Sequence, residues 1–280
     1  DLHSFPTRRS SDLHIAISGS GGLQQLGGGT TVLTANNSYT GVTTIAAGTL
    51  QIGDGGTSGA IAGDVANEGV LAFDRSDLVT LEGVLSGGGA LQQLGSGTTV
   101  LSAAGNSIGA TAIGAGTLRI DGGLTTPTLS MSGTSALTVN GTVEAAGATQ
   151  IALSGDAGVN SVTVAAGATL LAAGDLGDGA DVLDVAGTLD TGVGTFSLGA
   201  GDDTFVIYDT TLVSGALDGG DGNDLLDVNV GDGILVPLGA MTGFESLGKF
   251  GPGTLQVNGP ADFTEDRKST RLNSSHPYRS

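Results

Sequence analysis

The sequence predicts an all-β protein, a right-handed parallel β-helix that forms a single elongated domain. Three observations support this prediction: glycine accounts for 52 of the 280 residues, short apolar segments alternate with glycine-rich corners, and one long segment occurs twice at a fixed offset. Short strands at regular corners suit a solenoid, in which each coil stacks on the last through parallel pairing. We expect about twelve such coils, at roughly 20 residues or more per coil.

The composition narrows the class of protein further. Only 13% of the residues are charged while 39% are hydrophobic, and disordered chains show the opposite balance. The chain has no cysteine, which excludes disulfides and thiolate metal sites. The net charge of −19 argues against nucleic acid as a partner, because that partner requires a basic surface.

Internal repetition is the strongest signal in the sequence. The segment at 22–27 returns at 90–95, which is an offset of 68 (91 − 23) for its first leucine. The same offset, without a gap, carries 30–33 onto 98–101 and 48–52 onto 116–120, and a further copy of the last segment lies at 253–257. Such repetition indicates that one structural unit is used several times along the chain.

Each copy of the last segment has a simple physical interpretation. Glycine makes the turn at little steric cost, and the threonine that follows begins a strand. Because side chains alternate along a strand, Leu50 and Ile52 point to one side and Gln51 to the other. The predicted interior ladders therefore include the apolar residues of all copies: Leu50, Ile52, Leu118, Ile120, Leu255 and Val257.

The segments at 22–33, 37–41 and 48–52 resemble the repeat of bacterial autotransporter passenger regions, and 53–77 and 243–255 are also similar to that family. The resemblance covers roughly residues 15–263. The second copy departs from the pattern at 106–109, where Asn-Ser-Ile-Gly replaces an Asn-x-Tyr-Thr-Gly turn. The resemblance implies export and display by the protein's own C-terminal outer-membrane barrel. The expected location is the bacterial cell surface or outer membrane, or the extracellular medium if the passenger is cleaved.

The two ends differ sharply from the rest of the chain. Residues 1–13 and 265–280 resemble translated sequencing-library adapters, so we expect the β-helical passenger fragment to span 14–264. Segments that were never selected to fold are expected to pack poorly against the rod.

No catalytic residue is predicted. The pattern Gly105-Asn106-Ser107-Ile108-Gly109 matches a serine nucleophile turn, but that chemistry needs a histidine base, and His14 is the one histidine between the two ends. The basic residues that a polysaccharide lyase would need, Arg75, Arg119 and Lys249, lie in different motifs.

We therefore expect a non-catalytic stalk or scaffold. The alternative is an adhesin that binds a specific host-surface or neighbouring-cell ligand on the same fold. A polysaccharide-degrading enzyme is the third interpretation.

One candidate metal site remains. Residues 219–226 fit the calcium-binding nonapeptide, and 177–183 and 199–205 fit it without the first glycine. Asp181, Asp203 and Asp224 are 22 and 21 residues apart (203 − 181 and 224 − 203), close to one coil each, so they are expected to stack and to offer carboxylates to Ca²⁺. The alternative is that Gly-Asp is simply favourable turn chemistry. No other cofactor is expected.

Overall fold

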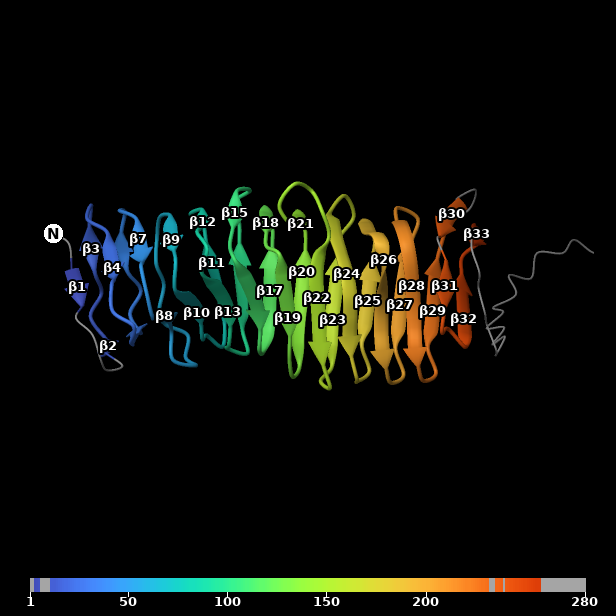
Figure 1. Ribbon diagram of the computed structural model, residues 1–280, viewed down its shortest axis with the longest axis horizontal. Helices are drawn as coiled ribbons and strands as arrows, with labels where there is room; N and C mark the ends of the chain where they lie inside the picture. Colours follow the sequence, from blue (N-terminus) through green and yellow to red (C-terminus); the bar gives the residue numbers. More distant parts are fainter. Residues whose placement is uncertain (1–2, 6–10, 232–234, 239, 258–280) are drawn as a thin grey trace, which may run out of the picture.

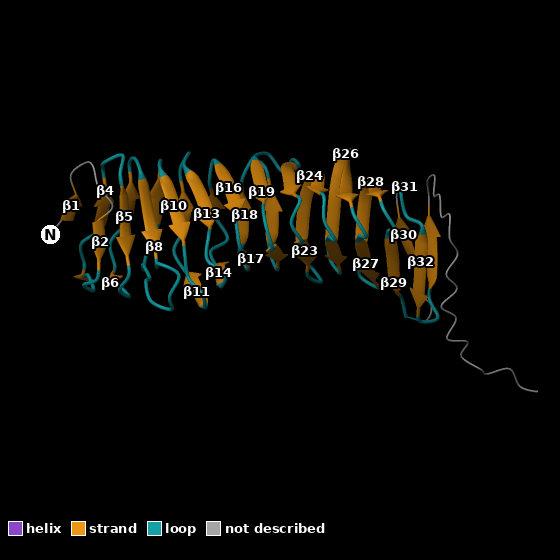
Figure 2. Cartoon of the chain, turned by 90° about the horizontal axis from the view of Figure 1, so that it is seen from below, coloured by secondary structure: helices purple, strands orange, loops and turns teal. Residues whose placement is uncertain are grey.

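The computed structural model describes residues 3–5, 11–231, 235–238 and 240–257, with side chains described for 12–231 and 240–254. The described residues form strands joined by turns and contain no helix (Figures 1 and 2). Accordingly, no helix in these ranges is available to span a membrane. Figure 1 shows a rod along which the sequence advances steadily from the N-terminal end.

The rod is a β-solenoid of about 11 turns, close to the number expected. Every pairing between named strands is parallel, as the sequence predicted. A full turn contains three strand positions, so strands of equal position form three columns along the rod. Columns one and two join into a single 20-stranded sheet because three long strands run through the corner between them: β24 (Thr169–Gly177), β26 (Thr188–Ala200) and β28 (Leu212–Asp221).

The remaining strands are short. Column one contains β1 (His3–Phe5), β4 (Leu23–Gln25), β7 (Thr43–Ile45), β9 (Val65–Asn67), β12 (Leu85–Ser86), β15 (Asn106–Ser107), β18 (Gly123–Thr125) and β21 (Thr142–Glu144). Column two contains β2 (Ser11–Leu13), β5 (Thr30–Leu33), β8 (Thr49–Ile52), β10 (Val70–Phe73), β13 (Ala90–Gln93), β16 (Ala110–Ile113), β19 (Thr128–Met131), β22 (Ile151–Asp156) and β31 (Met241–Thr242).

The third column is a separate nine-stranded sheet. It contains β11 (Leu78–Leu81), β14 (Thr98–Leu101), β17 (Gly116–Ile120), β20 (Ser135–Val139), β23 (Asn160–Val164), β25 (Val182–Val185), β27 (Thr204–Tyr208), β29 (Leu225–Asn229) and β32 (Ser246–Phe250). Two small pairs complete the described strands: β3 (Ser18–Gly19) with β6 (Ser38–Tyr39), and β30 (Leu235–Leu238) with β33 (Thr254–Val257).

Apolar ladders fill the inside of the rod. In the third column, Leu118 stacks on Leu137, which stacks on Val162, and all three are fully buried. Burying one such side chain stabilises the fold by about 1.5–3 kcal/mol before the loss of conformational entropy is counted. The predicted interior residues Leu50, Ile52, Leu118 and Ile120 are all buried, whereas the side chains of Leu255 and Val257 lie outside the described residues.

The two copies of the 68-residue repeat occupy different columns. Leu23 of the first copy lies in column one and stacks on Thr43, whereas Leu91 of the second copy lies in column two and stacks on Leu71. Three coils carry Leu23 onto Leu85, 62 residues further on (85 − 23), so the repeat offset overshoots a whole number of coils by six residues. The repeat therefore specifies a strand, a corner and a strand, and it works at two different corners of the coil.

A buried glutamine closes the corner in both copies. The Nε2 of Gln25 donates to the carbonyl oxygens of Gly27 (2.9 Å) and Gly29 (3.1 Å), and its Oε1 accepts from the hydroxyl of Thr31 (2.6 Å). Gln93 makes the equivalent three contacts with Gly95, Gly97 and Thr99. The carbonyl oxygens of Gly29 and Gly97 also accept from backbone N–H groups of the next coil, so each glutamine adds a second donor there and holds the corner closed from inside.

Two short parts of the N-terminal segment, 3–5 and 11–13, are described, and both pair with the rod. β1 pairs with β4, and β2 pairs with β5 residue for residue, so the stack of coils continues across the expected boundary at residue 14. Leu13 packs, half-buried, against the core. Parallel pairing uses backbone groups that every sequence supplies, so it does not decide the origin of the segment, and the adapter interpretation stays a prediction. Residues 265–280 lie outside the described residues.

Candidate functional site

The candidate site lies at the corner where the chain enters the third column. Asp181, Asp203 and Asp224 immediately precede β25, β27 and β29. Those strands pair with Val182 against Thr204 and Thr204 against Leu225, so the three aspartates lie one above another, each in its own coil. We call these three residues the aspartate column.

One oxygen of each carboxylate is used to join neighbouring coils. Asp203 Oδ1 accepts from the backbone N–H of Asp181 (2.6 Å), and Asp224 Oδ1 accepts from the N–H of Asp203 (2.8 Å). Asp181 Oδ1 accepts from the N–H of Asn160 (2.7 Å), and Glu245 Oε2 accepts from the N–H of Asp224 (2.8 Å). The side chain of each coil therefore satisfies a backbone donor of the coil before it.

The second oxygen of each carboxylate has no such partner. The Oδ2 atoms of Asp181, Asp203 and Asp224 are buried and accept no hydrogen bond, and the three residues are at most 1% exposed. An ionised oxygen withdrawn from water without a partner costs several kcal/mol. These three atoms are therefore the unsatisfied groups of the corner.

Asn160 occupies the same column one coil earlier and shows what the corner accommodates. It reaches back with a hydrogen-bond donor, since its Nδ2 donates to the carbonyl oxygen of Gly133 (3.0 Å) and to Ser135 Oγ (3.2 Å). An ionised carboxylate has no hydrogen to donate in this way. A carboxylate at such a position therefore lacks the donor that Asn160 offers to two oxygen atoms of the preceding coil.

Burial shifts the pKa of all three carboxyls in the same direction. Desolvation raises the pKa of Asp181 to about 7, and the negative charges of Asp203, Asp156 and Asp175 add to the shift, while the hydrogen bond from Asn160 opposes it. Desolvation likewise raises the pKa of Asp224 to about 6, with Asp203 and Glu245 contributing. Desolvation also raises the pKa of Asp203, with the charges of Asp202 and Asp175 adding to the shift and the hydrogen bond from the N–H of Asp181 opposing it. The corner therefore favours any species that neutralises these groups.

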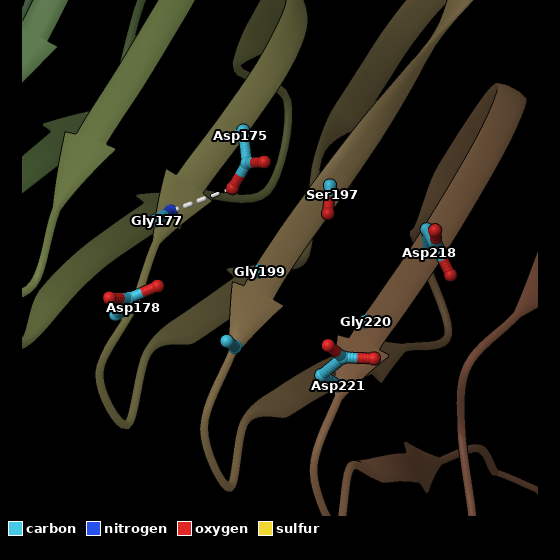
Figure 3. Close-up of a pocket in the computed structure, with 9 residues that line it drawn as sticks. Asp175, Gly177, Asp178, Ser197, Gly199, Asp218, Gly220 and Asp221 are labelled. Carbon is cyan, nitrogen blue, oxygen red and sulfur yellow. Dashed lines mark hydrogen bonds between the residues drawn. The ribbon is translucent and has the colours of Figure 1, made fainter.

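The surroundings of the aspartate column are strongly acidic. Asp175, Asp178, Asp218 and Asp221 line a shallow hollow of about 350 Å³ on the same three turns as the aspartate column. Figure 3 shows Asp175 and Asp218 on either side of Ser197. Residues 120–248 contain 17 acidic residues and no lysine, arginine or histidine. Side-chain cations are thus absent from this part of the sequence. Within the described residues, however, no three acidic or histidine side chains converge on one point that could hold a metal.

The other residues that the sequence singled out are dispersed. Ser107 is exposed on β15, while His14 bonds to Thr34 in a different coil (2.7 Å). Arg119 forms an exposed ion pair with Asp121 (2.8 Å), and Lys249 donates to the carbonyl oxygen of Gly251 (2.8 Å). The structure does not bring these side chains together.

Arg75 has a structural role that its sequence context did not indicate. It is buried, pairs through two nitrogens with Asp77 (2.8 Å each), and donates to the carbonyl oxygens of Thr57 and Gly59. The guanidinium therefore holds the loop at 53–59 in place. Its two contacts there are with residues that precede Arg75 in the sequence by 16 and 18 positions.

Sequence reasoning missed the members that extend the column, Asn160 and Glu245. Both are separated from the neighbouring aspartate by 21 residues (181 − 160 and 245 − 224), so the coil spacing could have found them. It also missed a groove of about 600 Å³ beside the column, where Leu225, Leu247 and the half-exposed Phe250 lie next to Asp202, Asn223 and Asp227. Its members come from three coils, and no local motif marks them.

Comparisons with known proteins agree with the resemblance seen in the sequence. Residues 23–52 and 91–120 each match the family model of the passenger-associated-transport-repeat. The chain is also 40% identical over 106 residues to the adhesin BmaC autotransporter of Brucella suis biovar 1 (strain 1330), across 38% of this chain. It spans 3% of the length of that relative. No solved structure gives a significant match. Together the matches support an autotransporter passenger region with repeats.

Proposed function

We propose that this chain is a non-catalytic stalk of an autotransporter-like protein, displayed at the bacterial cell surface or outer membrane, or outside the cell if it is cleaved. The observation that carries the proposal is that the coils stack along the rod without interruption, and that segments of this stack, 23–52 and 91–120, match the passenger repeat. Because each coil contacts only its neighbours, such a rod can hold attached segments away from a surface without an active site.

The resemblance to an adhesin supports a surface role but does not separate a plain stalk from a ligand-binding passenger. One feature favours the second possibility locally, namely the groove that contains Phe250. It combines apolar side chains with acidic and amide groups, which is the usual composition of a ligand site. A ligand on a host surface or a neighbouring cell is the partner that we propose for that case.

The stalk proposal can be tested by display on living cells. The full chain would be inserted between the export signal and the outer-membrane anchor of a known autotransporter, and exposure on intact cells would be measured by antibody labelling and protease digestion. We expect surface labelling and a protease-resistant band. A matched variant with Leu118→Asp, which places a charge in the core, should be displayed but digested.

The same cells distinguish the two functions. A plain stalk gives no binding to host cells, to neighbouring bacteria or to immobilised polysaccharide beyond that of the anchor alone. Saturable binding that Phe250→Ser abolishes would replace the stalk by the adhesin. Turnover of a polysaccharide by the purified chain would contradict the non-catalytic proposal.

A further inference from the structure

We infer that the aspartate column binds divalent cations of the calcium type, held between successive turns of the rod. The inference begins from the three buried Oδ2 atoms that accept no hydrogen bond. Their partner oxygens Oδ1 are already committed to the backbone of the preceding coil. Each carboxylate thus keeps one free oxygen at a fixed position in its coil.

A column of glycines runs beside the aspartate column. Gly133, Gly158, Gly179 and Gly201 stack so closely that a Cβ added to any of the last three would collide with the carbonyl oxygen of the glycine before it. Gly158, Gly179 and Gly201 stand two residues before Asn160, Asp181 and Asp203. Asn160 donates its amide to Gly133 of the previous coil, so the matching carbonyls for the aspartate column are those of Gly158, Gly179 and Gly201.

In the proposed site each Oδ2 atom faces the matching carbonyl oxygen, and two oxygen atoms in that position need a positive species between them. Calcium is suited to this arrangement because it accepts six to eight oxygen ligands and combines carboxylates with backbone carbonyls and water in irregular geometry. Magnesium is less suited, because it requires near-ideal octahedral geometry and gives up its water reluctantly. The nonapeptide at 219–226 is in agreement with this choice of ion.

The acidic surroundings support cation binding independently of the ligands. The hollow with Asp175, Asp178, Asp218 and Asp221 lies on the same turns, and no basic side chain occurs between residues 120 and 248. A field of one sign raises the local concentration of counter-ions. With one carboxylate oxygen per ion, we expect affinity at the weak end of extracellular calcium sites, about 10⁻⁴–10⁻³ M.

The test uses the full chain and substitutions that change charge but not shape. Asp203→Asn keeps an acceptor for the N–H of Asp181 and gains an amide donor like the one with which Asn160 reaches the previous coil, so we expect it to fold. The triple variant Asp181→Asn, Asp203→Asn, Asp224→Asn removes the whole column. The matched control is Asp190→Asn, which removes the same charge on β26 and keeps Oδ1 as the acceptor for Gly192 and Ser214.

Melting would be followed by circular dichroism in chelator and in about 10 mM Ca²⁺, roughly ten times the weaker expected dissociation constant. Calorimetric titration would give the affinity. We expect calcium to raise the Tm of the parent and of Asp190→Asn by a few degrees, to bind Asp203→Asn at least tenfold more weakly, and to leave the triple variant unchanged. Magnesium at the same concentration should produce a smaller rise.

Three results would overturn the inference. The first is an absence of binding by the parent at about 10 mM Ca²⁺. The second is a triple variant that binds like the parent, and loss of binding in Asp175→Asn with Asp218→Asn would then assign the ion to the surface hollow. The third is a proton in place of the cation, shown by a Tm in chelator that is higher at pH 5 than at pH 8 together with no response to calcium at pH 8.

Discussion

At the scale of single residues, buried polar side chains in this rod are placed by the backbone groups that they satisfy. Gln93 is 1% exposed and makes three hydrogen bonds within its own corner, whereas Gln92 beside it points outward. Tyr39 is also buried, and its hydroxyl forms a hydrogen bond with Thr43 Oγ1 inside the core (2.6 Å).

Replacement of Gln93 by leucine should lower the free energy of unfolding by about 2–4 kcal/mol, because the Gly95 carbonyl oxygen and the Thr99 hydroxyl lose their partner in a buried corner. The Gly97 carbonyl oxygen keeps the N–H of Thr117. Gln92→Leu, the control in the same strand, should change it by less than about 0.5 kcal/mol. Thermal melting monitored by circular dichroism measures both. Equal effects of the two substitutions would contradict the role of the corner amide.

Tyr39→Phe should give a pH-dependent loss of stability. Below pH 10 the variant loses about 1 kcal/mol, because the buried Thr43 hydroxyl is left without its partner. Burial raises the pKa of Tyr39 above its usual value, while in the unfolded chain it remains about 10. The folded parent therefore holds the proton longer than the unfolded chain, and its stability falls as the pH rises from about 10 through the folded pKa.

Phenylalanine has no proton to lose, so the difference between parent and Tyr39→Phe should narrow above about pH 10. Urea unfolding at pH 8 and pH 11 tests this. A difference that widens with pH would mean that the phenolate is favoured in the core and would contradict the assignment.

At the scale of elements, strands and corners are local, but the longest loop of the N-terminal half depends on a distant side chain. The segment between β8 and β9 contains five glycines within 53–63, and Arg75 fixes it through the carbonyl oxygens of Thr57 and Gly59. A chain so rich in glycine gains considerable entropy when it is released. The guanidinium of Arg75 therefore keeps this loop ordered.

Arg75→Lys should release this loop, since a lysine ammonium cannot reproduce the two-nitrogen pairing with Asp77 while also reaching both carbonyls. We expect faster proteolytic cleavage within 53–61 and an unchanged strand signal in circular dichroism. Arg119→Lys, at an exposed pair, is the matched control and should be cleaved at the parental rate. Cleavage at equal rates in both variants would show that the loop is ordered by other contacts.

At the scale of the whole molecule, negative charge is concentrated along the second half of the rod. Seventeen acidic residues without a basic one between 120 and 248 repel each other across stacked coils, which lie about 4.8 Å apart. That spacing is shorter than the screening length of about 10 Å at 0.1 M salt, so the repulsion is only partly screened under ordinary conditions.

Monovalent salt should therefore stabilise the rod in the absence of divalent cations. We expect the Tm to rise by a few degrees between about 0.01 M and 0.3 M NaCl, where the screening length falls from about 30 Å to below 8 Å. The variant Asp178→Asn with Asp221→Asn should start from a higher Tm and respond less. A Tm that is flat or falls with salt in the parent would rule out repulsion as a significant term.

The sequence alone was sufficient to predict the β-solenoid, because its signals are local. Glycine corners and the alternation of Leu50, Gln51 and Ile52 specify a strand and its inward face wherever they occur, and the buried side chains follow that alternation. Coil-length spacing also predicted that Asp181, Asp203 and Asp224 would be neighbours. The strands, their inward faces and the stacking of the three aspartates all depend on contacts within one coil or between residues one coil length apart in the sequence.

Only the tertiary structure decided which column each segment joins, because that depends on the summed lengths of all corners before it. The 68-residue repeat thus lies on different columns at Leu23 and Leu91, although the two segments are almost identical in sequence. The sequence also did not reveal the partners of Arg75 or the unpaired Oδ2 atoms of the aspartate column. Whether a buried polar atom finds a partner is determined by neighbouring coils, and a single coil's sequence does not contain that information.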